Sequence, residues 1–261
     1  LWSQIFGAPD LPRPFGSQQG ERIDRVIVDK NGDIVVVGYT LTANSFTVGG
    51  ETGIAVSPED IGNDGFNENF VFVIKFSPDG MPIIASAWDL ESYNIDIEES
   101  SDGYYVSGYS DYAEYDDEVV YFGRSNLFVK RLSNDFDVIW SRYMHASENQ
   151  WFRDSAVAPD DSIYLTGLTT ASFGGHSYAG DSDIFVTKLN AEGVIQGTKL
   201  LGGTDRDEGK FIYVDPFGNP TVYAATSSSD IFGYEASTYG FIWSDIEIQT
   251  DPYAECRLFF R

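Results

Sequence analysis

The chain of 261 residues is 42% hydrophobic and 15% aromatic, which is enough apolar material for one large folded domain and excludes a disordered chain. Its 41 acidic and 16 basic residues leave a formal net charge of -25, which repels nucleic acid and anionic lipid and excludes both as direct partners. Cations, basic surfaces and polar ligands remain as partners. A simpler interpretation is that the charge only keeps the protein soluble and dispersed.

Cysteine content and hydropathy exclude further classes of protein. Cys256 is the only cysteine, so the chain forms no internal disulfide and no cysteine-based zinc site. No run of about 18 apolar residues is present, so we expect no membrane insertion. The opening residues LWSQIFG contain neither a Met nor a signal-type apolar stretch, so we expect a processed chain or a piece of a longer one.

In chain order, the first recurring phrase is LWSQIFG at 1–7, which returns as IWSRYMH at 139–145 and more faintly as IQGTKLLGG at 195–203. The second phrase is a Gly/Asp turn followed by a β-rich run that closes on a small residue. The four copies lie at 29–40, 101–110, 159–169 and 215–226, and close on Gly38, Gly108, Gly167 and Ala224.

The third phrase is a strand running into a tight turn: NFVFVIKFSPDG at 69–80, SNLFVKRLSNDF at 125–136 and SDIFVTKLNAEG at 182–193. The copies start 56 and 57 residues apart, and recurrence at a fixed period predicts repeated structural units. We place the units at approximately 1–80, 81–136, 137–193 and 194–261 of a single domain.

Strand periodicity predicts how these units pack. Ile184 and Val186 fall on one face of the run at 183–189, and Phe185 and Leu189 fall on the other. A strand that is apolar on both faces has to be covered on both, which predicts sheets stacked face to face. Each period holds four strand-like runs and shows no sustained helical pattern. The prediction is an all-β protein, a β-propeller of about four four-stranded blades.

The repeat also resembles a known family. Its combined pattern is D-x-x-G-x-x-x-V-x-G-x-T, then D-x-F-V-x-K-[LFY]-[ND]-x-[DE]-G, then L-W-[ST]-x-x-[FL]-G, which resembles the SBBP-type β-propeller repeat of bacterial, often secreted or surface, proteins. The resemblance covers nearly the whole chain and is best at 155–218. In the last unit Phe241 keeps its place, but Ser244 replaces the basic residue. The resemblance implies a propeller and a repeated scaffold, and no shared catalytic residues.

Chain order suggests how the ring would close. The chain begins on a fourth-strand phrase and ends after a third-strand phrase, so the N-terminal strand is expected to complete the last blade. CRLFFR at 256–261 competes for that place. Alternatively, the four units form a segment of a larger ring.

The connections between strands differ at the two ends of the predicted blades. The turns from first to second and from third to fourth strand are short and alike, as in DKNGD and SPDG, whereas the other connections are long and unlike one another. Alternate connections of a propeller emerge at opposite ends, so the variable ones share one end, which is the candidate functional face.

That face is rich in acidic residues, whose carboxylates are ligands that calcium prefers. Calcium is the cofactor that such loops would take. The alternative is a solvated acidic rim, because no loop matches the full D-x-[DN]-x-[DN]-G ladder. The candidate metal ligands are Asp64, Asp116, Asp117, Asp181, Asp183 and Asp205.

The same face carries aromatic residues that could stack on sugar rings or anchor a protein partner. The alternative is that several of them fill gaps between blades. The candidate ligand-binding residues are Phe66, Tyr112, Tyr115, Trp151, Phe152 and Tyr178.

Catalytic patterns are weak. His145 and His176 are the only histidines, and neither lies in a G-x-S-x-G or H-x-x-x-H pattern, so we expect no enzyme. A glycoside hydrolase would need converging carboxylates in a deep axial pocket. The recurring basic residues Lys75, Arg131 and Lys188 are expected to cover a blade face and pair with a neighbouring acid.

The sequence therefore predicts a non-catalytic β-propeller module with a binding or structural role in an extracellular, surface or particle-associated assembly. Its partners would be a protein or polysaccharide surface, or further chains of the same assembly. We expect an extracellular or cell-surface location, with a periplasmic or virion-associated one as the alternative. The alternative functions are a calcium-dependent carbohydrate-binding or adhesion module and a propeller glycoside hydrolase.

Overall fold

A computed structural model describes residues 6–7, 21–40, 46–48, 54–56, 70–90, 92–115, 118–228, 246–250 and 256–260. Throughout these residues the regular secondary structure is β, as the sequence pattern predicts. No helix within the described residues is long and apolar enough to cross a membrane.

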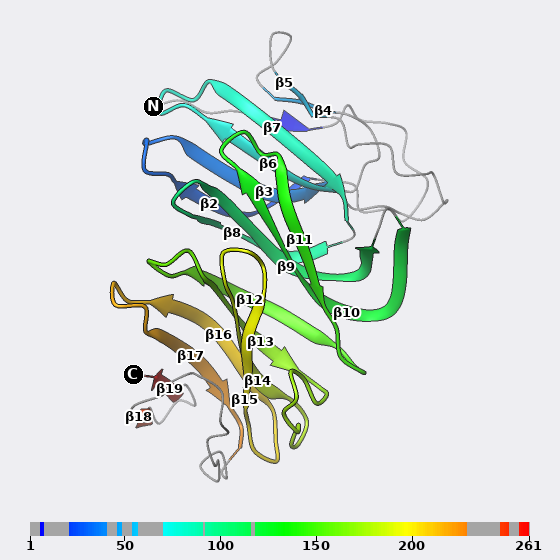
Figure 1. Ribbon diagram of the computed structural model, residues 1–261, viewed down its shortest axis with the longest axis vertical. Coiled ribbons are helices and arrows are strands. Elements are labelled where there is room, and N and C mark those ends of the chain that lie inside the picture. Colours follow the sequence, from blue (N-terminus) through cyan, green and yellow to red (C-terminus); the bar gives the residue numbers. More distant parts are fainter. Residues whose placement is uncertain are drawn as a thin grey trace.

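Four antiparallel sheets follow one another along the chain (Figure 1). In each sheet neighbouring strands are consecutive along the chain, apart from an insertion between β3 and β6 in the first. The first sheet contains β2 (Glu21–Val28), β3 (Ile34–Thr40), β6 (Phe70–Phe76) and β7 (Pro82–Asp89). The second contains β8 (Ser92–Glu99), β9 (Gly103–Tyr115), β10 (Glu118–Ser133) and β11 (Val138–Met144). The third contains β12 (Gln150–Val157), β13 (Ile163–Thr169), β14 (Asp183–Leu189) and β15 (Ile195–Leu201), and the fourth β16 (Asp207–Val214) and β17 (Pro220–Thr226).

Two smaller sheets complete the described strands. β1 (Phe6–Gly7), β4 (Phe46–Val48) and β5 (Ile54–Val56) form one, and β18 (Ile246–Thr250) pairs with β19 (Cys256–Phe260) in the other.

The position of β1 corrects one prediction. The N-terminal strand was expected to complete the last sheet, but Phe6–Gly7 pairs with Thr47 and Val48 of β4. It is β19, near the C-terminus, that lies beside β17. In each case the partner strand is nearer along the chain than the opposite terminus, and the shorter loop costs less entropy to close.

Third strands are covered on both faces, which confirms the predicted stacking. β6 is buried at every position. In β14, Ile184 belongs to a core cluster with Ile212 and Val222 of the fourth sheet, whereas Phe185 packs in a cluster with Leu127 of the second sheet. Burying a side chain of this size contributes about 1.5–3 kcal/mol, so these layers hold neighbouring sheets together.

The small residue that closes each second strand has a steric cause. A Cβ at Gly167 would lie 2.0 Å from the carbonyl oxygen of Trp151 on β12 and 2.9 Å from the Phe185 ring on β14. Gly38 has the same relation to the Arg22 carbonyl and to the Phe72 ring. In the fourth sheet, Ala224 replaces the glycine.

Ala224 pairs with Gly209 of β16, and a Cβ at Gly209 would lie 2.2 Å from Thr166 Oγ1, so this glycine allows a close contact with the third sheet. A β-bulge interrupts the register of the first strand in each of the four sheets.

The recurring basic residues behave as expected. Lys75, Arg131 and Lys188 each lie over a tyrosine ring, those of Tyr104, Tyr105 and Tyr164 respectively. Each also pairs with an acid: Lys75 Nζ is 3.9 Å from Asp29, Arg131 Nη2 is 2.6 Å from Asp102, and Lys188 Nζ is 3.6 Å from Asp160.

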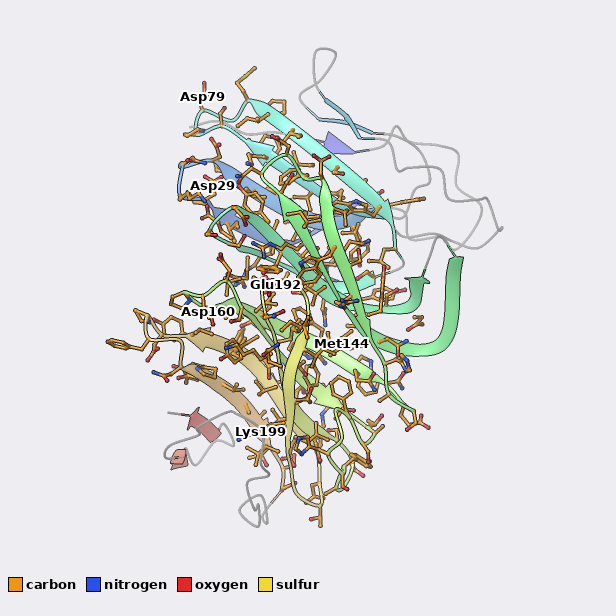
Figure 2. The ribbon with its side chains drawn as sticks, viewed as in Figure 1. Asp29, Asp79, Met144, Asp160, Glu192 and Lys199 are labelled. Atoms are coloured by element: carbon orange, nitrogen blue, oxygen red, sulfur yellow. The ribbon has the colours of Figure 1, made fainter. Side chains whose placement is uncertain are left out.

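Short turns of neighbouring sheets lie side by side at one end. The Lys30 amide donates to Glu99 of the next sheet at 2.9 Å, and the Ser101 amide donates to Asp161 at 2.8 Å. Figure 2 shows the turn residues Asp29 and Asp160 on the same side of the sheets. The first strands begin at the opposite end, where the longer connections enter.

Candidate functional site

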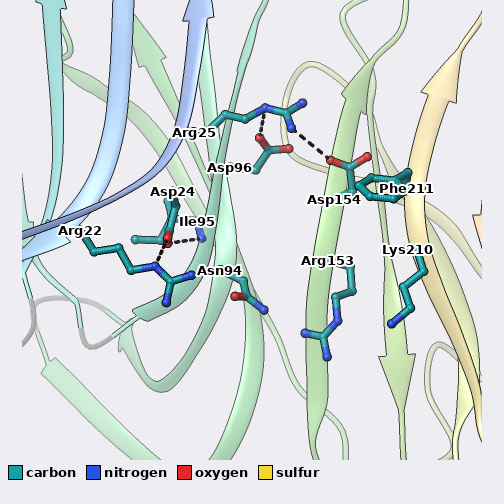
Figure 3. Close-up of a pocket in the computed structure, with 10 residues that line it drawn as sticks. All are labelled: Arg22, Asp24, Arg25, Asn94, Ile95, Asp96, Arg153, Asp154, Lys210 and Phe211. Atoms are coloured by element: carbon teal, nitrogen blue, oxygen red, sulfur yellow. Dashed lines mark hydrogen bonds and ion pairs between the residues drawn. The ribbon is translucent and has the colours of Figure 1, made fainter.

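The first strands β2, β8, β12 and β16 share a cavity of about 280 Å³, which we call the inner-strand cavity (Figure 3). Eight of its ten lining residues are polar or charged, whereas the faces between the sheets are apolar. The lining residues are Arg22, Asp24, Arg25, Asn94, Ile95, Asp96, Arg153, Asp154, Lys210 and Phe211.

β-Bulges place these residues. The register of each first strand shifts at the same level, between Ile23 and Arg25 in β2 and between Phe152 and Asp154 in β12. An extra residue in one strand re-aims the neighbouring side chains, so adjacent charged residues need not alternate strictly between the two faces. Asn94, in the bulge of β8, has a φ of 49°, a left-handed conformation that asparagine tolerates better than most residues.

Three aspartates of this cavity link the sheets. Asp24 accepts from the amide of Ile95 at 3.1 Å, Asp96 from the amide of Ser155 at 3.1 Å, and Asp154 from the amide of Ile212 at 2.8 Å. In each pair the carboxylate lies on one first strand and the amide on the next. These bonds give all three aspartates a structural role.

Deeper along the strands, one cation faces three carboxyl groups. Arg25 Nε is 3.1 Å from Asp96, its Nη2 is 3.4 Å from Glu98, and its Nη1 is 4.0 Å from Asp154. We call these four residues the inner ionic group.

Burial makes the acids of the inner ionic group hold their protons. Burial is the main reason that the pKa of Asp96 is raised. Burial, together with the negative charge of Asp96, also raises the pKa of Asp154 to about 7 and that of Glu98 to about 8. Near neutral pH the single guanidinium therefore faces carboxyl groups that are partly neutral.

Nearer the start of the strands, cations outnumber carboxyl groups. Glu208 accepts from Arg153 Nε at 2.5 Å, and its carboxylate is 2.9 Å from Arg206 Nη2 and 2.8 Å from Lys210 Nζ. Burial raises the pKa of Glu208, but hydrogen bonds from Lys210, Arg153 and Arg206 outweigh it and lower the pKa to about 2. Glu208 is thus a carboxylate throughout the physiological range.

Arg22 extends this group, since its Nε lies 2.8 Å from Asp24. Together these residues hold four cations and two carboxylates, a surplus of two positive charges in an acidic chain. We call the set the cationic mouth: Arg22, Asp24, Arg153, Arg206, Glu208 and Lys210. Figure 3 shows the head groups of Arg22, Arg153 and Lys210 extending to one side of the cavity, and Arg25 lying at the other.

Three of the aspartates proposed as metal ligands lie in the described residues, and these three form no metal site. Asp64, Asp116 and Asp117 lie outside the described residues. Asp181 and Asp205 are exposed, and the Asp181 amide donates to the Asp205 carbonyl oxygen at 3.4 Å.

Asp183 is buried and accepts from the Ala179 amide at 3.0 Å. Burial, with the charge of Asp207, raises the pKa of Asp183 to about 6. Within the segments that the structure describes, no three Asp, Glu, His or Cys side chains gather to hold a metal ion.

The structure describes the side chains of three of the predicted aromatic residues: Trp151, Phe152 and Tyr178. Phe66 and the side chains of Tyr112 and Tyr115 lie outside the described residues, although both tyrosines belong to β9. Trp151 is half-buried on β12, and Tyr178 is half-buried with its hydroxyl donating to the Asp181 carbonyl oxygen at 3.2 Å.

Phe152 requires a correction. It is fully buried in the core between the second and third sheets, so it is no ligand-binding residue. The sequence pattern placed it at the end of a connection, but β12 begins at Gln150 and Phe152 points into the sheet stack.

The basic residues of the inner-strand cavity were not predicted from the sequence. A usable signal was present, because Arg22, Arg25, Arg153 and Lys210 account for four of only 16 basic residues and all lie in runs that begin a sheet. Convergence of these runs on one cavity required the bulges and the stacking, which the sequence pattern did not specify.

Comparison with known proteins gives no family for this chain. No protein-family model matches it, and no curated protein matches it in sequence. The function is therefore argued from the geometry of the inner-strand cavity and its surroundings.

Proposed function

We propose that this chain is a non-catalytic β-propeller module that binds a polysaccharide surface at the end where its first strands begin. The stacked four-stranded meanders, with their first strands adjacent, support the propeller. The resemblance to SBBP-type repeats supports an extracellular or cell-surface location.

The observation that carries the proposal is the inner-strand cavity. It is concave, lies between four sheets, and is nearest the end at which the long connections enter. Pockets for larger ligands span about 300–1,000 Å³, so a cavity of about 280 Å³ suits one sugar-sized unit. The half-exposed ring of Phe211 at its edge offers an apolar surface on which a sugar ring can stack.

Binding fits the carboxyl groups of this cavity better than catalysis does. Asp24, Asp96 and Asp154 each accept a backbone hydrogen bond from the next sheet. A carboxyl group that must protonate a leaving group or attack a sugar needs at least one oxygen directed at the substrate. Their engagement between the sheets favours a scaffold role.

Affinity electrophoresis of the purified chain tests the proposal. Gels would contain either neutral polysaccharides such as cellulose ethers and mannan, or acidic ones such as pectate and alginate. We expect retardation in at least one gel and no new reducing ends after prolonged incubation. Unaltered mobility in every gel would remove polysaccharide binding, and release of reducing sugar would show an enzyme.

The same gels test the calcium-dependent alternative. Calcium at the acidic loops would make retardation disappear when EDTA is added and return with excess calcium. Binding through the inner-strand cavity predicts retardation that EDTA leaves unchanged.

A further inference from the structure

We propose that the cationic mouth binds the carboxylate of a single acidic sugar residue, with the sugar ring seated in the inner-strand cavity. This inference rests on the proposed function and names the ligand and the residues that select it. It moves the binding site from the acidic and aromatic loops to the first strands.

Charge at the mouth is opposite to that of the protein as a whole. The chain has a net charge of -25, yet the mouth has two more cations than carboxylates. At physiological salt the Debye length is about 8 Å, so distant acidic residues are largely screened from a group that touches the mouth. An isolated negative charge is therefore attracted, whereas a long polyanion also meets the acidic surface around it.

Donor groups at the mouth outnumber acceptors. Three guanidinium groups and one ammonium offer about 18 N–H donors, while the carboxylates of Asp24 and Glu208 offer about eight lone-pair positions. The side chain of Arg22 is 61% exposed and that of Lys210 is 42% exposed, so both heads reach solvent. A ligand carboxylate supplies two further acceptor oxygens in a planar arrangement that suits a guanidinium.

A bridge between sheets does not need so many cations. Arg153 on β12 paired with Glu208 on β16 already joins the third and fourth sheets. Arg206 and Lys210 come from the same segment as Glu208 and add positive charge without adding a link between sheets. The surplus is explained if a negative group from outside completes the set.

The rest of the cavity suits a sugar ring. Asn94 lines the cavity with an amide whose Nδ2 donates to the Phe152 carbonyl oxygen at 3.5 Å, which leaves its second N–H and its oxygen for a ligand. The acids of the inner ionic group lie behind it, partly protonated. Phe211 is 63% exposed and offers a flat apolar face. Hydroxyl groups, one apolar ring face and one carboxylate together describe a hexuronic acid residue.

The test compares three probes: the methyl glycoside of a hexuronic acid, the methyl glycoside of the corresponding neutral hexose, and the 6-sulfate of that neutral glycoside. Binding is measured by NMR titration of the full chain in low salt. We expect the hexuronide to bind at least about tenfold more tightly than the neutral glycoside, the effect of one charge-assisted contact. The sulfate ester should bind more weakly than the hexuronide, because its tetrahedral anionic group is larger and does not have the planar arrangement of oxygens that suits a guanidinium.

Variants locate the site. Arg22→Gln and Lys210→Gln each remove one cation from the mouth and should weaken hexuronide binding about fivefold or more. Lys30→Gln makes the same change of net charge at the short-turn end and should leave the affinity within about twofold. Thermal melting confirms that each variant is folded, and both mouth residues are exposed enough for this to hold.

Each outcome decides the inference. Equal binding of hexuronide and neutral glycoside, or equal losses in Lys30→Gln and Arg22→Gln, would overturn it. Tighter binding of the sulfate ester would overturn the inference that the ligand group is a carboxylate and would indicate a sulfated sugar instead. If polysaccharide gels retard the protein while all three glycosides fail to bind, the inference fails and the proposed function stands. If no gel retards it, the proposed function fails as well.

Discussion

Two ionic groups lie along the same first strands with opposite composition. In the inner ionic group one guanidinium faces three carboxyl groups, whereas at the cationic mouth Glu208 faces three cations. Burial, together with the charge of Asp96, raises the pKa of Asp154 to about 7, whereas hydrogen bonds from three cations outweigh burial and lower that of Glu208 to about 2. Carboxyl groups on neighbouring strands thus have different protonation states, because burial dominates at Asp154 and the surrounding cations dominate at Glu208.

This difference assigns a structural role to the inner ionic group and a binding role to the cationic mouth. Buried, partly neutral acids with backbone partners hold the sheets together, and exposed cations in excess remain able to meet a ligand. Changes in the inner ionic group should therefore alter stability and its pH dependence, whereas changes in the exposed cations of the mouth should alter binding.

The largest effect is expected when the inner ionic group loses its cation. Arg25→Met leaves the buried carboxylate of Asp96 without its ion pair. Breaking a buried pair costs about 3–5 kcal/mol, and because the Arg25 side chain is 42% exposed we expect about 3 kcal/mol at pH 8. Urea unfolding should show a smaller loss at pH 5, where Asp154 and Glu98 are protonated and the group carries less negative charge. An equal loss at both pH values would show that charge is not the cause.

Removing the Glu208 carboxylate from the cationic mouth is expected to lower stability somewhat less. The pKa of Glu208 is about 2 in the folded chain and near 4.5 when unfolded, so its charge stabilises the fold above pH 4.5 and this contribution is lost as the pH falls toward 2. Solvent screens its partly exposed partners, so we expect Glu208→Gln to lower stability by about 2 kcal/mol at pH 7.

The pH profile provides the control for that variant. The difference between Glu208→Gln and the natural chain should begin to shrink as the pH is lowered below 4.5. A difference that stays constant from pH 7 to pH 3.5 would contradict the role of its charge.

Asp154→Asn is expected to stabilise the protein. The folded pKa of Asp154 is about 7, above its unfolded value near 3.8, so its contribution to stability is complete below pH 3.8 and is lost as the pH rises to about 7. Asparagine stays neutral and keeps an oxygen that can accept from the Ile212 amide. We expect no difference at pH 4 and a gain of about 1.5 kcal/mol at pH 8 by thermal or urea unfolding.

Coupling to Asp96 and Glu98 is the reason that the expected gain is smaller than the full pKa shift implies. A variant that is less stable than the natural chain at pH 8 would show that Asp154 acts there as a needed carboxylate.

The smallest effect on stability is expected at the rim of the mouth. Arg22→Gln removes a 61%-exposed side chain and its pair with Asp24. Exposed ion pairs contribute less than about 1 kcal/mol, so thermal melting should change little. A large loss of stability in this variant would show that Arg22 has a structural role, like the residues of the inner ionic group, and would contradict the comparison.

Much of the fold could be predicted from the sequence because the pattern of apolar residues within each strand determines which faces are buried. The run at 183–189 is apolar on both faces, and the structure buries Phe185 and Ile184 against different neighbouring sheets. The pairing of the recurring basic residues with a neighbouring acid was also predicted correctly, since Lys188 pairs with Asp160.

The site escaped prediction because it depends on register. Each first strand carries a β-bulge, and a shift of one residue exchanges the two faces of a strand. The sequence alone therefore does not specify that Arg153 faces the cavity while Phe152 lies in the core. Pairing of β1 with β4 likewise depends on the long connection after β3, whose strands are only three residues each.

A crystal structure of the chain soaked with the methyl hexuronide would test the central claim most directly. Our account predicts the sugar between β2, β8, β12 and β16, with its carboxylate within hydrogen-bonding distance of Arg22, Arg153 or Lys210. First strands that do not share a cavity, or a sugar whose carboxylate lies away from these cations, would contradict it.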